Sequence, residues 1–200
     1  MSGPRIYVAS LADYNAGNLH GVWIEDLSDV DAIQGEINTM LRASKHPNVQ
    51  VDCLECDGIA TQPGASVCGP CNGSGKVPSA EEWAVHDHEG FEGIKLGEHP
   101  SLDDIVLHAS MLDTHDGAWA AYVGNVGAHS ATEDGFSESY RGEYSSPEDY
   151  AKELISECYD TKDMGDLANY IDYEKFARDL RFDGYSFVPG GSGVYVFTNS

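Results

Sequence analysis

Four of the five cysteines form two CxxC pairs that lie close together in the sequence, and no other feature constrains the fold as strongly. The pairs are Cys53 with Cys56 and Cys68 with Cys71, separated by eleven residues. Two such knuckles joined by a short loop can place four thiolates around one tetrahedral metal ion, with metal–sulfur distances of about 2.3 Å. We therefore predict one structural zinc ion per chain. A site closed by four thiolates has no open coordination position, so we expect it to be non-catalytic.

A disulfide pair and a redox-active CxxC are the alternatives for these cysteines. The N-terminus lacks the charged-then-apolar pattern of a signal peptide, and no apolar run reaches the ~18–20 residues of a membrane span. We therefore expect a cytoplasmic protein that does not contact a membrane, and disulfides are rare in that compartment. A redox motif would not explain a doubled knuckle. The fifth cysteine, Cys158, is expected on the inner face of a helix as a buried free thiol.

The second knuckle also has a known counterpart. Residues 68–75, with the sequence CGPCNGSG, resemble the CxxCxGxG repeat of the zinc domain in DnaJ-type chaperones, and the first knuckle matches that repeat as far as Gly58. A zinc-binding chaperone-like module is therefore an alternative function, although the sequence offers no evident peptide-binding groove.

Hydrophobic periodicity predicts an α+β chain on both sides of the cysteines. A β-β-α-β unit is interrupted by an insertion at residues 48–80, which shows no periodicity. The strands and the helix of this unit are expected at residues 5–11, 19–25, 29–44 and 82–87. Helices are then expected at residues 101–111, 119–126, 147–160 and 172–181, and a C-terminal hairpin at residues 185–189 and 194–197. Residues 128–146 are polar and low in periodicity.

The chain is strongly acidic, with 34 Asp and Glu residues against 11 Lys and Arg residues and a formal net charge of −23. Because no cation surplus is present to displace counterions, we exclude nucleic acid and anionic lipid as partners. The acids are spread along the chain, among apolar residues whose spacing is typical of helices and strands. This distribution argues against a disordered acidic tail. The motifs of common catalytic sites (P-loop, GxSxG, GxGxxG after a strand) are missing, so we do not expect an enzyme.

The acids are best organised on the helix expected at residues 147–160. Asp149, Glu153, Glu157 and Asp160 lie at i, i+4, i+8 and i+11, opposite the apolar stripe. Neighbouring like charges cost about 0.2–0.5 kcal/mol per pair, so a functional explanation is favoured. A halophilic surface, which carries acids only to stay hydrated, is the structural alternative.

The same acids could stand in for the phosphates of DNA. Two chains would carry −46, twice the −23 of one chain, which equals the charge on about 78 Å of duplex. Asp103 and Asp104 are further candidates for phosphate-mimicking carboxylates.

Several segments outside the insertion are similar to one family, the ArdA antirestriction proteins. They are residues 5–17, 20–23, 81–91 and 169–180. Members of this family, encoded on mobile genetic elements, mimic the shape and charge of bent B-form DNA and occupy the DNA-binding groove of type I restriction–modification enzymes. The resemblance implies competitive binding to the methyltransferase–specificity complex of such an enzyme.

The resemblance also implies an elongated, curved homodimer of three-lobed chains. The lobes would be residues 1–91 with the zinc-knuckle insertion, a helical lobe at 92–127, and an α/β lobe at 128–200. Val194, Tyr195, Val196 and Phe197, on the expected exposed edge of the last strand, are candidates for the dimer interface. The zinc insertion departs from the common pattern of the family.

Overall fold

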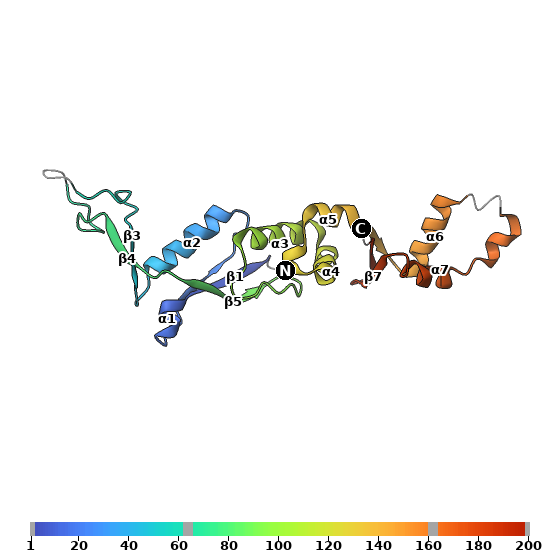
Figure 1. Cartoon of the computed structure of the whole chain (residues 1–200), viewed down its shortest axis with the longest axis horizontal. Helices are drawn as coiled ribbons and strands as arrows, with labels where there is room; N and C mark the ends of the chain where they lie inside the picture. The colour runs from blue at the N-terminus through green and yellow to red at the C-terminus, as the bar shows by residue number, and fades with distance from the viewer. Residues whose placement is uncertain (1–2, 62–65, 160–163, 199–200) are drawn as a thin grey trace. The chain divides into compact units, whose positions relative to one another are not determined.

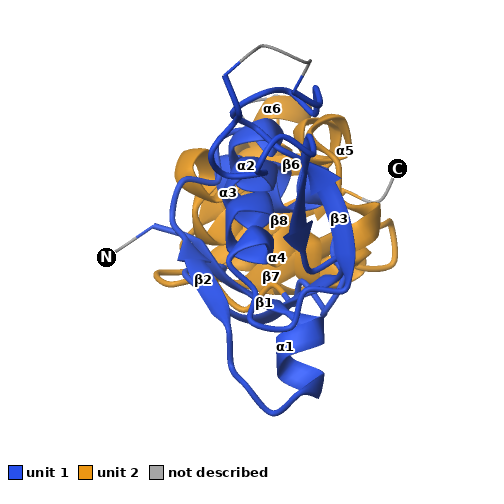
Figure 2. Ribbon diagram, turned by 90° about the vertical axis from the view of Figure 1, so that its left-hand side faces the viewer, with its two compact units in different colours: residues 1–91, 95–110 blue, residues 92–94, 111–200 orange. Residues whose placement is uncertain are grey.

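The computed structural model describes residues 3–61, 66–159 and 164–198, and its contacts divide the chain into two compact units. Unit 1 comprises residues 1–91 and 95–110, and unit 2 comprises residues 92–94 and 111–200 (Figure 2). Helices and small antiparallel sheets occur in both units, which confirms the α+β class. The division into three lobes stays a prediction.

Unit 1 is built on a three-stranded antiparallel sheet with the order β2-β1-β5 (Figure 1). The strands are β1 (Arg5–Ser10), β2 (Gly21–Ile24) and β5 (Trp83–Glu89). Helix α2 (Val30–Arg42) contributes Ile33 and Ile37 to the core, where both are fully buried. The expected strands and helix are thus confirmed. The short helix α1 (Leu11–Asn15) follows β1 directly, with Ser10 as its N-cap.

The cysteine insertion contains a hairpin that the sequence pattern does not predict. Strands β3 (Val49–Asp52) and β4 (Lys76–Ser79) pair antiparallel. Lys76 forms a 2.7 Å ion pair with Asp52 across the hairpin. The chain after β4 is attached to the end of α2, because the Ala80 N–H donates a 3.0 Å hydrogen bond to the Leu41 carbonyl.

Helix α3 (Leu102–His115) begins in unit 1 and ends in unit 2. The other elements of unit 2 are α4 (Gly117–Val126), η1 (Ala128–Ser130), α5 (Glu133–Ser139), β6 (Tyr140–Tyr144), α6 (Pro147–Cys158), η2 (Gly165–Tyr170), α7 (Tyr173–Leu180), β7 (Tyr185–Pro189) and β8 (Val194–Thr198). An aromatic cluster of Trp119, Tyr122, Phe136 and Phe197 forms one part of the core. Tyr150, Leu180, Phe187 and Val196 form another.

The expectation that β8 exposes a free edge is wrong. The sheet order is β6-β8-β7, so β8 is the central strand and its backbone groups pair on both sides. Val196 and Phe197 are buried, with relative exposures of 0% and 1%. The reason is β6, which arises from the weakly periodic segment 128–146 and covers the edge that a two-stranded hairpin would leave open. Val194, Tyr195, Val196 and Phe197 therefore offer no free strand edge for a partner.

Cys158 is also placed differently from the expectation. It is exposed rather than buried. As the last residue of α6, it lies beyond Tyr150, Ala151 and Ile155, the buried residues of that helix. Within the described parts of the chain, no helix combines the length and the apolar character needed to cross a membrane.

Candidate functional site

The four cysteines of the insertion converge on one point. The sulfur atoms of Cys53, Cys56, Cys68 and Cys71 all lie within 4.8 Å of one another. The Sγ atoms are 3.8 Å apart for Cys53 and Cys68, and 3.7 Å apart for Cys56 and Cys71. Four sulfurs about 2.3 Å from a tetrahedral ion would be separated by about 3.8 Å. A disulfide needs an S–S distance of about 2.05 Å, so these are free thiols arranged as a metal site requires.

The two knuckles share one backbone design. Asp57 and Gly58 follow the first CxxC pair, and Asn72 and Gly73 follow the second; all four have positive φ angles of 48°, 74°, 49° and 82°. The turns bring the N–H of each glycine back to the carbonyl of the first cysteine of its pair, at 3.1 Å for Gly58 and 3.3 Å for Gly73. Asp, Asn and Gly are the residues that accept the left-handed conformation most readily. The sequence therefore builds the same sulfur-presenting turn twice.

The thiols of the cluster differ widely in acidity. Burial, together with hydrogen bonds that the Cys56 thiol shares with the other cysteines, raises the pKa of Cys56 to about 12. Burial also acts to raise the pKa of Cys71, but the Gly75 N–H, 3.4 Å from its sulfur, and hydrogen bonds from Cys68 and Cys56 lower it to about 6. A bound dication is what would allow all four buried or half-buried sulfurs to be thiolates together. These donors suit a soft, tetrahedral ion such as Zn²⁺.

The acidic side chains lie almost entirely on the surface. Among the described residues, Asp13 is the one acid that is buried, and Asp104, Glu148, Asp149 and Asp179 are half-buried. Every other Asp or Glu in residues 3–61, 66–159 and 164–198 is exposed. The 11 Lys and Arg residues cannot neutralise 34 acids one to one. The folded chain therefore carries its excess charge as solvent-facing carboxylates.

Helix α6 presents three of the candidate acids in a row. Glu153 and Glu157 are exposed and Asp149 is half-buried, whereas Asp160 lies outside the described residues. Eight residues of α-helix separate Asp149 from Glu157, a rise of about 12 Å. Asp149 lies 3.4 Å from the ammonium of Lys152, so the charges of Glu153 and Glu157 dominate the exposed face.

The position of Glu153 is fixed from the neighbouring strand. The Tyr144 hydroxyl, at the end of β6, donates a 2.9 Å hydrogen bond to the Glu153 carboxylate. Burial, this hydrogen bond and the negative charges of Glu153 and Glu157 raise the pKa of Tyr144 to about 12. The phenol therefore remains a donor across the physiological range.

Asp103 and Asp104 have a local explanation in the helix itself. They occupy the first turn of α3, where the Asp104 N–H donates a 3.0 Å hydrogen bond to the hydroxyl of Ser101. Negative charges in a first turn stabilise the positive end of the helix dipole. Both residues belong to unit 1, whereas the α6 acids belong to unit 2.

The acid Asp13 has a structural role that the sequence pattern does not indicate. Its side chain accepts hydrogen bonds from the hydroxyls of Ser10 and Ser44 and from the N–H of Lys45. Although burial acts to raise its pKa, these hydrogen bonds and the nearby His20 hold that pKa below its usual range. Asp13 thereby links α1 to the segment that follows α2. The sequence does not reveal this role, because Ser10 and Ser44 are 34 residues apart and meet at Asp13 only in the folded chain.

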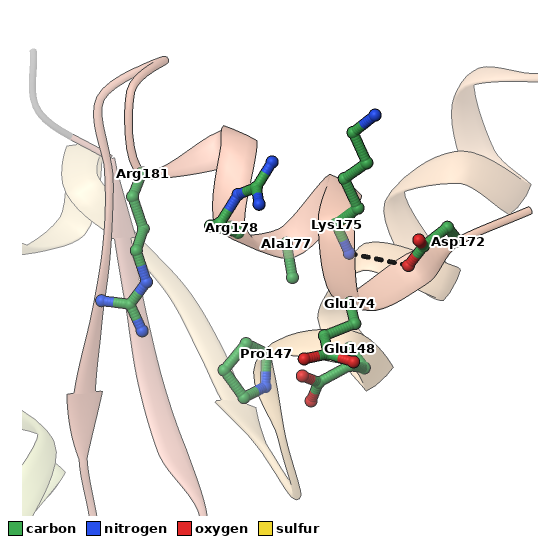
Figure 3. Close-up of a pocket in the computed structure, with 8 residues that line it drawn as sticks. All are labelled: Pro147, Glu148, Asp172, Glu174, Lys175, Ala177, Arg178 and Arg181. Atoms are coloured by element: carbon green, nitrogen blue, oxygen red, sulfur yellow. Dashed lines mark hydrogen bonds between the residues drawn. The ribbon is translucent and has the colours of Figure 1, made fainter.

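Helix α7 interrupts the acidic surface of unit 2. A groove of about 390 Å³ beside it is lined by both cations and acids, as Figure 3 shows. The charged residues are Lys175, Arg178, Arg181, Glu148, Asp172 and Glu174. Arg178 pairs with Asp179 at 2.9 Å, and the Arg181 guanidinium lies 5.1 Å from the centre of the Phe187 ring. The charge beside α7 is therefore mixed, whereas Glu153 and Glu157 on α6 are exposed acids.

Comparison with models of known protein families gives a match over nearly the whole chain. The model of the family described as antirestriction protein (ArdA) matches residues 6–194. No curated protein sequence matches the chain. Because the family match covers nearly all of the 200 residues, the chain belongs to the ArdA antirestriction family.

Proposed function

We propose that this protein inhibits type I restriction–modification enzymes by placing fixed carboxylates at the positions where the enzyme binds the phosphates of DNA. The observation that carries the proposal is the exposure of nearly all described acids on a chain of net charge −23, in a member of an antirestriction family. The row of acids on α6 is the best-defined part of this surface. The protein acts by occupancy and not by catalysis.

The mechanism follows from charge complementarity. A DNA-binding groove lined with Lys and Arg attracts a polyanion at long range, which accelerates association and makes it sensitive to salt. Carboxylates held on a folded scaffold lose less conformational freedom on binding than those of a flexible acidic tail. The enzyme bound in this way cannot bind DNA, so unmodified DNA escapes cleavage. A homodimer would double the charge and extend the surface along the groove.

In this proposal the zinc ion has a structural role and takes no direct part in inhibition. Cys53, Cys56, Cys68 and Cys71 would hold it, and it would stabilise the insertion, in which few of the described residues (48–61 and 66–80) are buried. Structural zinc contributes directly to the folding free energy of such small segments.

The test is cleavage of unmodified DNA by a purified type I enzyme in the presence of the protein, repeated at increasing salt. We expect inhibition that weakens steeply as ionic strength rises, because exposed charges are screened within about 8–10 Å at physiological salt. Inhibition that stays constant over the salt range, while the enzyme itself remains active, would contradict the proposal. In vivo, the corresponding measurement is the restriction of incoming unmodified DNA, which should fall in cells that express the protein.

A further inference from the structure

An apolar groove lies in unit 1, between α2 and β2. Its volume is about 630 Å³, and apolar residues form much of its lining: Val22, Ala32, Met40, Ala43 and Leu54. The ring of His20 is hydrogen-bonded to the Met40 carbonyl at 2.8 Å. This bond joins α2 to the chain before β2, so the floor of the groove is formed before any partner arrives.

The composition of this face is unusual for such an acidic chain. The exposed residues of α2 that line the groove are Ala32, Gly35, Glu36 and Thr39, followed by the C-cap Ala43, with one charge among them. Leu54 at its border is 69% exposed. A phosphate mimic gains nothing from uncharged surface, whereas exposed apolar patches rimmed by polar groups mark protein interaction sites.

Charge decides which kind of partner fits. The lining of the groove holds one acid, Glu36, and no Lys or Arg, so a cationic segment gains more here than a second copy of a chain with net charge −23. The partner that the carboxylates attract is cationic. A Lys or Arg side chain can lay its apolar stem along the groove and direct its charge to Glu36. We propose that this groove docks an apolar segment of the restriction enzyme that carries Lys or Arg, as a second contact outside the carboxylate surface; the inference rests on the proposed function.

The zinc knuckle contributes one wall of the groove. Leu54 lies inside the first CxxC pair, between Cys53 and Cys56. The position of its side chain therefore depends on the turn that presents those two sulfurs. This gives the insertion a role in partner binding, through Leu54, in addition to its role in the fold.

Gly35 allows the groove to be filled without strain. A Cβ atom added to Gly35 would meet no other atom within 4 Å, and its φ angle is ordinary for a helix. Gly35→Phe therefore places a ring in the groove, and Gly35→Ala is the matched control because it favours the helix and leaves the groove open. Leu54→Ala is a second variant, which removes exposed surface from the groove and leaves the core intact.

The experiment measures binding and inhibition of the type I enzyme by wild type and the three variants at several salt concentrations. We expect Gly35→Phe to weaken both by about tenfold with an unchanged salt slope, because the lost contact is apolar. Leu54→Ala should weaken them less, and Gly35→Ala should match wild type. Melting curves and light scattering confirm that each variant is folded and report its oligomeric state.

Three outcomes would overturn the inference. Gly35→Phe and Leu54→Ala could both bind the enzyme as tightly as Gly35→Ala, which would leave the groove without a role in binding while the proposed function stands. Gly35→Phe could instead change the oligomeric state, which would make the groove a contact between copies. If wild type does not bind the enzyme at any salt concentration, both the proposed function and the role of the groove fail.

Discussion

Tyr144 holds Glu153: its phenol donates a 2.9 Å hydrogen bond to the carboxylate from the end of β6. The strand and the acidic helix α6 are thereby connected through the side chain that carries the charge. A carboxylate fixed in this way resembles a phosphate of a duplex more closely than a free glutamate does, because its position is set before binding.

Replacing the Tyr144 hydroxyl should leave the Glu153 carboxylate free to move. For Tyr144→Phe we expect the free energy of unfolding to fall by about 0.5–1.5 kcal/mol, the value of a typical hydrogen bond, and inhibition to weaken by about two- to threefold. Urea unfolding and the cleavage assay measure the two effects. Tyr159→Phe, at a tyrosine that is 58% exposed, is the matched control. An equal loss in both variants would show that the hydrogen bond has no specific role.

Neutralising an acid of α6 should affect stability and inhibition in opposite directions. In Glu157→Gln one like-charge pair with Glu153 is removed, so we expect unfolding to become harder by about 0.2–0.5 kcal/mol. Inhibition should weaken by about two- to fivefold because an exposed ion pair contributes ~1 kcal/mol or less.

The control for Glu157→Gln is Asp57→Asn, which removes the same charge from the zinc knuckle. Asn is tolerated there, since Asn72 adopts the same left-handed conformation in the second knuckle. If Asp57→Asn weakens inhibition as much as Glu157→Gln, net charge and not the placement of the acids determines binding.

Asp13 should make unit 1 sensitive to acid. Asp13→Ala leaves the donors of Ser10, Ser44 and Lys45 without an acceptor, and we expect unfolding to become easier by about 2–4 kcal/mol. The lowered pKa means that the ionised Asp13 contributes stability above its unfolded pKa of about 3.9. This contribution disappears as the pH falls through the lower folded pKa.

The pH dependence is measured as the difference in unfolding free energy between wild type and Asp13→Asn. Other carboxylates titrate in both proteins, so the difference isolates Asp13. We expect the gap to be constant from neutral pH to about pH 5 and to shrink below pH 4. An unchanged gap at pH 3, or a similar gap for the exposed Asp183→Asn variant, would be inconsistent with this account.

Protein purified without added metal should contain one zinc ion per chain. Cys56→Ser and Cys68→Ser should lose the metal, and Cys158→Ser, which changes an exposed cysteine outside the cluster, should retain it. Chelation should make residues 48–80 sensitive to protease while the β2-β1-β5 sheet stays protected, because that sheet has its own apolar core. Metal analysis giving a stoichiometry near zero for wild type would refute the assignment.

The sequence predicts those features that depend on local chemistry. The cysteine spacing alone identifies the four residues that converge in the structure, and Pro147 after Ser146 marks the start of α6 as observed. Periodicity over a dozen residues likewise predicts α2. Each of these signals is contained within one element.

Features that depend on pairing between distant segments cannot be predicted from local patterns. Strand β6 has only five residues, and Gly142 within it has a φ angle of 118°, so it becomes a strand through pairing with β8. Because β6 pairs with β8, Val194 to Phe197 form a central strand and not an edge. The hairpin of β3 and β4 was hidden for a similar reason, because its strands are four residues long and β4 contains Pro78.

Competition with DNA tests the central claim most directly. The binding of labelled duplex DNA to the methyltransferase–specificity complex would be measured at several DNA concentrations while the protein is titrated in. Mimicry predicts complete displacement of the DNA, with an apparent inhibition constant that rises in proportion to the DNA concentration. A ternary complex of enzyme, DNA and protein, or an inhibition constant that does not depend on DNA, would contradict it.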